Sequence, residues 1–137
     1  MVDRDIILEK VAIIQRCLGR ISHVTHLEKD TLNDIDIQDI FVLNLQRAIQ
    51  ASVDIAAHVI AFEGYGLPDT LRAHFDLLAQ NNIISKEISL KMKAMVSFRN
   101  IAVHEYQNIN PDILKSILST NLGDIEEFYK TILQKFE

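Results

Sequence analysis

Glycine and proline are scarce in this sequence, with four and two residues among 137, and tryptophan is absent. Few residues are therefore available for tight turns, which argues against many β-hairpins and favours long helices joined by a few loops. The single cysteine, Cys17, has no partner for an internal disulfide, so we expect a reducing compartment. Its apolar neighbours Ile13, Ile14 and Leu18 indicate a packed side chain, with a reactive thiol as the alternative.

The sequence also lacks a long apolar run and an excess of basic charge. No run approaches 18 apolar residues, and the N-terminal stretch "MVDRDIILEKV" has no apolar core typical of a signal peptide. We therefore expect a cytoplasmic chain without membrane contact. Acidic residues outnumber basic ones by 19 to 14, which gives a net charge of −5 and no overall basic footprint for nucleic acid.

Hydrophobic residues make up 48% of the chain, enough for one well-packed core. We expect residues 1–137 to form a single domain. An apolar face with spacings of four and three predicts a first helix over 3–28, through Ile7, Val11, Ile14, Leu18 and Ile21. Similar patterns predict four more helices, at 39–63, about 69–80, 85–104 and from 110 to the C-terminus. The prediction is an all-α, antiparallel bundle of about five helices, with the all-round apolar helix 39–63 at its centre.

The spacing of the carboxylates and histidines matches no common metal-binding pattern. The acidic stretch "HLEKDTLNDIDIQDI" lacks the pattern of a calcium loop and reads as a loop leading into the second helix. Asp54 and His58 are four residues apart on that helix, but a di-metal bundle needs Glu-x-x-His pairs from two helices. We therefore expect no metal and no other cofactor, and we expect Asp54 to pair with His58 or Arg99.

The stretch "SFRNIAVHEYQNINPD", residues 97–112, gathers polar side chains at the end of the fourth predicted helix. Arg99 lies at the edge of the apolar face and about 140° from His104 around the helix. The two converge if the arginine wraps round, if the helix end unwinds, or if a second copy of the chain supplies the facing groups. One polar stripe contains Lys93, Ser97, Asn100 and His104.

Each of these side chains has a structural and a functional interpretation. Arg99 is suited to an ion pair with a carboxylate such as Asp54, or to clamping a phosphate with its forked donors. His104 is favourable at a helix C-terminus, and histidine is also the natural proton-transfer group near neutral pH. Tyr106 is either a packing residue or part of the same site.

The segment "RNIAVHEY" resembles the HepT-like toxin branch of the HEPN superfamily, whose motif is Arg-x4-His-x-Tyr. The segments "LNLQRAIQASVDIAAHVI" and "NPDILKSIL" are also similar, so the resemblance covers essentially the whole chain. It implies a toxin of a bacterial or archaeal toxin–antitoxin system, acting as a metal-independent endoribonuclease. The RNA 2′-hydroxyl would attack the adjacent phosphorus.

The resemblance also assigns roles and partners. His104 would act as general base or acid, Arg99 would stabilise the transition-state charge, and Asn100 would orient a group or bind the phosphate. Tyr106 would accept AMP from a nucleotidyltransferase-fold antitoxin. A homodimer through the motif face of the fourth helix would line one cleft with two motifs.

The resemblance leaves two points open. The alternative to an enzyme is a non-catalytic HEPN module that serves as a partner subunit of a nucleotidyltransferase. The acidic net charge also requires the attraction for RNA to be local. It would come from basic residues such as Arg47, Lys91, Lys93 and Arg99, or from a specific folded RNA.

Overall fold

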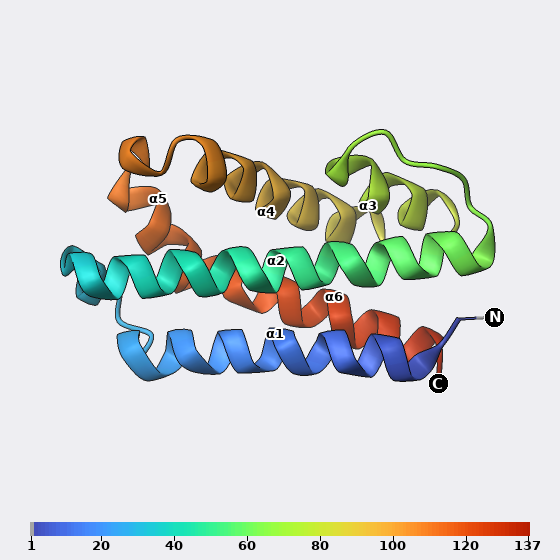
Figure 1. The fold of residues 1–137 in the computed structure, drawn as a ribbon, viewed down its shortest axis with the longest axis horizontal. Coiled ribbons are helices and arrows are strands. Elements are labelled where there is room, and N and C mark those ends of the chain that lie inside the picture. Colours follow the sequence, from blue (N-terminus) through green and yellow to red (C-terminus); the bar gives the residue numbers. More distant parts are fainter. Residues whose placement is uncertain (1) are drawn as a thin grey trace.

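The computed structural model describes residues 2–137, and in this part of the chain every regular element is helical (Figure 1). Long helices α1, α2, α4 and α6 run along the molecule in alternating directions, and both termini lie at one end (Figure 1). This confirms the predicted antiparallel all-α bundle. The elements are α1 Arg4–Thr25, η1 Lys29–Asn33, α2 Ile35–Glu63, α3 Leu71–Gln80, α4 Lys86–His104, η2 Tyr106–Asn108, α5 Pro111–Ser116, η3 Ile117–Asn121 and α6 Leu122–Lys135.

The connection between α1 and α2 differs from the prediction at both helix ends. α1 ends at Thr25 because His26 adopts the left-handed conformation, with φ 52°, and its N–H bonds the carbonyl of Ser22. α2 begins at Ile35, four residues before the predicted start. The Asp34 side chain accepts hydrogen bonds from the N–H groups of residues 36 and 37 and so caps the helix. Part of the predicted acidic loop is therefore the first turn of α2.

α2 is the central helix, as predicted. It packs against α1, α3, α4 and α6, and its side chains are buried around most of its circumference. Gly64 ends it in the left-handed conformation at φ 70°, which glycine adopts without steric cost. On α1, Cys17 is 4% exposed, which confirms that its thiol packs in the core.

The predicted fifth helix follows one path but contains a change of helical type. α5 leads into a π-helical segment, η3, and then into α6. A π-helical turn holds an extra residue, so it shifts the face that the following helix presents. On α6, Phe128 is fully buried and packs edge-on against Phe75 of α3, with ring centroids 5.4 Å apart.

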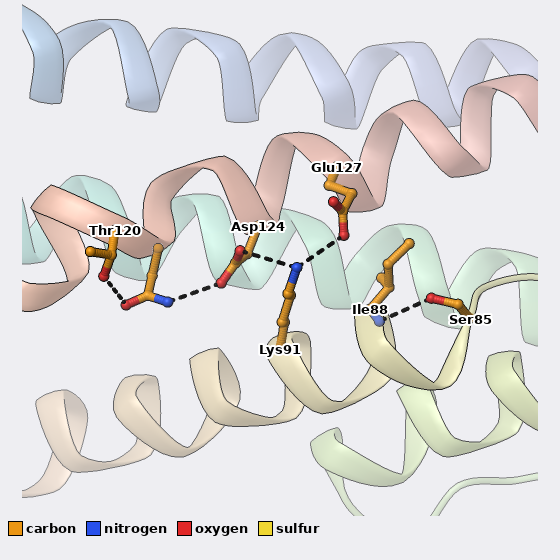
Figure 2. Close-up of polar contacts among 7 residues, drawn as sticks. Ser85, Ile88, Lys91, Thr120, Asp124 and Glu127 are labelled. Atoms are coloured by element: carbon orange, nitrogen blue, oxygen red, sulfur yellow. Dashed lines mark hydrogen bonds and ion pairs between the residues drawn. The ribbon is translucent and has the colours of Figure 1, made fainter.

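α4 is fixed to α6 by a small polar cluster, shown in Figure 2. The Lys91 ammonium lies 3.9 Å from an Asp124 carboxylate oxygen and 3.5 Å from one of Glu127. Asn121, the last residue of the π-helical segment, donates to Asp124 at 3.2 Å. These contacts hold the helix that bears the motif and neutralise the charge of Lys91.

No helix described for residues 2–137 is long and apolar enough to cross a membrane.

Candidate functional site

Arg99 and His104 of the motif lie on the last two turns of α4, which is helical through His104, and Tyr106 follows on η2. The Glu105 N–H bonds the carbonyl of Ile101 at 2.7 Å and closes the final turn. The helix therefore does not unwind between Arg99 and His104, so unwinding does not bring them together. Arg99 and Asn100 are half-buried, and His104 is exposed at the helix end.

The guanidinium of Arg99 turns toward the polar stripe. Its Nη1 donates to Oδ1 of Asn100 at 3.3 Å. No ion pair to Arg99 and no hydrogen bond to the His104 imidazole is found among the residues that the structure describes. Arg99 and Asn100 therefore form one unit with donors left for an anion, and His104 stands apart from it.

The predicted partners of Asp54 are wrong. Its Oδ2 lies 3.1 Å from the ammonium of Lys10 on α1, and its Oδ1 accepts a hydrogen bond from Gln50 at 3.0 Å. The α1–α2 contact brings Lys10 within reach, and the sequence spacing gives no sign of it. Asp54 therefore contributes to helix packing and has no contact with Arg99 that would make it a supporting residue.

His58 also has a structural role. Its Nε2 accepts the backbone N–H of Asp3 at 3.0 Å, and its ring packs on Phe62 with centroids 4.5 Å apart. The described residues contain no group of three or more His, Cys, Asp or Glu side chains arranged to hold a metal ion.

The lower part of the polar stripe is occupied by contacts with α3. Lys93 pairs with Asp76 at 2.8 Å, and Arg72 donates to the hydroxyl of Ser97 at 2.6 Å. The contacts with α3 involve Lys93 and Ser97, and the other two residues of the stripe, Asn100 and His104, lie nearer the C-terminal end of α4. A groove of about 630 Å³ lies beside the stripe, between α3, α4 and the segment after α4, and its lining includes neither Arg99 nor His104.

Asp39 contacts the candidate site residue Tyr106, and the sequence did not reveal this contact. The hydroxyl of Tyr106, on η2, donates a hydrogen bond to Oδ1 of Asp39, in the first turns of α2. The contact joins residues 67 apart in the chain. Partial burial, this hydrogen bond and the negative charge of Asp39 together raise the pKa of Tyr106 to about 12.

We expect the Tyr106 hydroxyl to lose its proton only at high pH, and its pKa to fall when Asp39 is replaced. In the native chain its pKa is raised from 10 to about 12, and D39N removes the carboxylate charge and lowers it toward 10. Because the folded chain holds the proton more tightly, the stabilisation is full below pH 10 and is lost as the pH rises through 12. Tyrosinate absorbance, with Y106F subtracted to remove the other tyrosines, measures the shift. An unchanged Tyr106 titration in D39N would contradict the contact.

Comparison with known proteins identifies the family of the chain. A sequence profile of the HepT-like family, described as ribonuclease HepT-like, matches residues 14–132. This chain belongs to the HepT-like family. The mRNA nuclease HepT of Shewanella oneidensis is 43% identical over 128 residues, which cover 93% of this chain and 96% of that protein.

Solved structures of HepT-like relatives have the same fold. A chain in the crystal structure of a toxin–antitoxin with AMP-PNP superposes with a TM-score of 0.90 and 42% identity, over 97% of this chain and 99% of that one. A tri-AMPylated HEPN toxin of Shewanella oneidensis, in complex with MNT antitoxin, gives a TM-score of 0.89 and 42% identity, over 97% and 98% of the two chains. The predicted HEPN-like bundle is thereby confirmed.

Proposed function

We propose that this HepT-like chain is the toxin of a toxin–antitoxin pair and cleaves cellular RNA in the cytoplasm as a metal-independent endoribonuclease. The observation that carries the proposal is an Arg99–Asn100 unit and an exposed His104 on the last two turns of one helix, in a chain 43% identical to an mRNA nuclease. These groups supply an anion clamp and a proton carrier, the two functions that transesterification of an RNA phosphodiester uses.

In the proposed reaction, the His104 imidazole accepts the proton of the RNA 2′-hydroxyl. The 2′-oxygen attacks the adjacent phosphorus, the bond from phosphorus to the 5′-oxygen breaks, and that oxygen takes a proton from imidazolium or solvent. The products are a 2′,3′-cyclic phosphate and a 5′-hydroxyl. Arg99 and Asn100 donate hydrogen bonds to the phosphate oxygens, which gain negative charge in the transition state.

We place the complete site in a cleft between two copies of the chain. Within one chain, Arg99 is half-buried with Asn100, and His104 is exposed without a hydrogen-bonded partner among the described residues. Within the motif, Val103 and Ile101 are 49% and 45% exposed. The two side chains are about 160° apart around α4, one on each side of the stripe that Asn100 and His104 share. A second copy packed over this stripe would bring a second motif opposite the first.

Tyr106 is the proposed acceptor of AMP from a nucleotidyltransferase-fold antitoxin. Its hydroxyl oxygen would attack the α-phosphorus of ATP, pyrophosphate would leave, and the phenol proton would be lost. The modified oxygen has no proton to donate to Asp39, and the new phosphate adds negative charge beside that carboxylate. Modification would therefore break the contact between η2 and α2 and repel RNA from the end of α4.

We expect the Y106F chain to escape the antitoxin. Phenylalanine keeps the ring but removes the nucleophilic oxygen, so incorporation of radiolabelled AMP from ATP falls to background while RNA cleavage continues. Y65F is the matched control, because Tyr65 lies outside the motif in the turn after α2. Equal AMP incorporation into Y106F and the native chain would show that another residue is modified.

The test of the overall function is expression without a partner gene. The native chain should arrest growth and degrade cellular RNA, and co-expression of the nucleotidyltransferase should restore growth. The purified chain should cleave RNA in the presence of EDTA. If the native chain and H104A are equally harmless, the chain is instead a non-catalytic module that acts as a partner of the nucleotidyltransferase.

A further inference from the structure

A groove between α1 and α2 gathers three arginines. It has a volume of about 410 Å³, and its lining includes Arg16 and Arg20 from α1 and Arg47 from α2. The lining contains no aspartate or glutamate, although acidic residues outnumber basic ones in the whole chain. Half of the six arginines of an acidic protein therefore lie around one hollow, which we call the arginine groove.

These three guanidinium groups are available to a ligand. In the described part of the chain none of them makes an ion pair or a side-chain hydrogen bond, whereas Arg4 bonds two backbone carbonyls and Arg72 bonds Ser97. All three positive charges also act on the thiol of Cys17, which lines the groove. Burial raises the pKa of the Cys17 thiol, and the charges of the three arginines oppose that rise.

The arginine groove opens close to the motif. Asp39, Leu43 and Arg47 follow at every fourth residue, so they lie along one face of α2. At about 1.5 Å per residue, Arg47 lies about 12 Å along the helix axis from Asp39, which Tyr106 contacts. Leu43, which lies between them, lines the groove and is 47% exposed, so this part of the face of α2 is open to solvent.

We propose that the arginine groove binds the phosphodiester backbone of the RNA, beside the bond to be cleaved. This inference rests on the proposed endoribonuclease function and adds to it a substrate-binding site outside the motif. The guanidinium fork matches phosphate oxygens, and an RNA strand presents one such charge at every nucleotide. Apolar side chains at the edge, such as Leu43, offer a surface for ribose.

Two observations favour RNA over an acidic protein surface. The other basic residues considered for local attraction on α4, Lys91 and Lys93, are held in ion pairs with Asp124, Glu127 and Asp76. An acidic enzyme that attracts RNA needs unpaired basic charge near its catalytic groups, and the arginine groove supplies it. The groove is also a small hollow of about 410 Å³, which suits one strand better than a broad protein face.

The test measures binding, not cleavage, in an H104A background so that the RNA stays intact. Fluorescence anisotropy with a fluorescein-labelled single-stranded RNA gives the affinity at several salt concentrations. Each phosphate contact contributes about 0.7 to the slope of log affinity against log salt, so R16Q/R20Q/R47Q should lower the slope by about 2. The matched control K86Q/K130Q/K135Q removes the same charge from α4 and α6, outside the groove lining, and should leave most of the slope.

The charge-retaining variant R16K/R20K/R47K should keep most of the slope, which separates loss of charge from loss of folding, and circular dichroism checks the helices of each variant. Equal slopes for the arginine-to-glutamine and lysine-to-glutamine variants would overturn the inference. So would an unchanged RNA slope together with weaker binding of the nucleotidyltransferase antitoxin. Because binding is read without cleavage, failure of the ribonuclease proposal alone would leave the salt dependence intact.

Discussion

Replacing His104 with alanine should lower the rate of RNA cleavage by about 10²–10⁴-fold, the range typical for loss of a general acid or base. The substitution should slow the chemical step without changing the fold. His104 is exposed as the last residue of α4, and no hydrogen bond to its ring is found in the described part of the chain. Removing the imidazole therefore leaves the core unchanged and takes away only a small interaction with the helix dipole.

The measurement is the cleavage rate of a defined RNA, followed by gel electrophoresis under single-turnover conditions, with the melting temperature as a check on folding. H23A is the matched control, since His23 is also an exposed histidine in the last turn of a helix. Its rate should equal that of the native chain. Equal cleavage rates for H104A and H23A would show that His104 has no role in the cleavage reaction.

The sequence predicted the bundle because apolar periodicity depends on local spacing. The faces on α1 and α2 and the end of α4 at His104 are set by side chains within a few turns of each other. The start of α2 was misplaced because Asp34 and Asp39 are both plausible caps, and only the structure shows that Asp34 binds the first N–H groups.

Contacts between distant segments could not be predicted in the same way. The sequence offers Asp54 several basic residues as partners, and the pairing with Lys10 depends on how α1 packs against α2. Asp39 is one of several acidic residues around the start of α2, and only the path of the chain after α4 brings Tyr106 to it. The arginine groove likewise combines two helices, so neither helix alone reveals it.

The roles proposed for Arg99 and His104 in a shared cleft predict a second large effect. R99A and H104A chains should each be inactive alone, and a heterodimer of the two should regain about half of the native activity, because one of its two symmetry-related sites is intact. That site takes His104 from the R99A chain and Arg99 from the H104A chain. The other site lacks both groups.

Co-expression of the two chains with different affinity tags allows the heterodimer to be purified over two columns. A doubly tagged R99A dimer, prepared in the same way, controls for the tags and should stay inactive. If the heterodimer is as inactive as its parents, each site draws Arg99 and His104 from one chain. The guanidinium, already turned toward Asn100, would then have to continue around α4 toward the imidazole on binding RNA. Recovery of activity would instead show that the rigid end of α4 holds the two groups apart in each chain and that pairing of two chains completes the site.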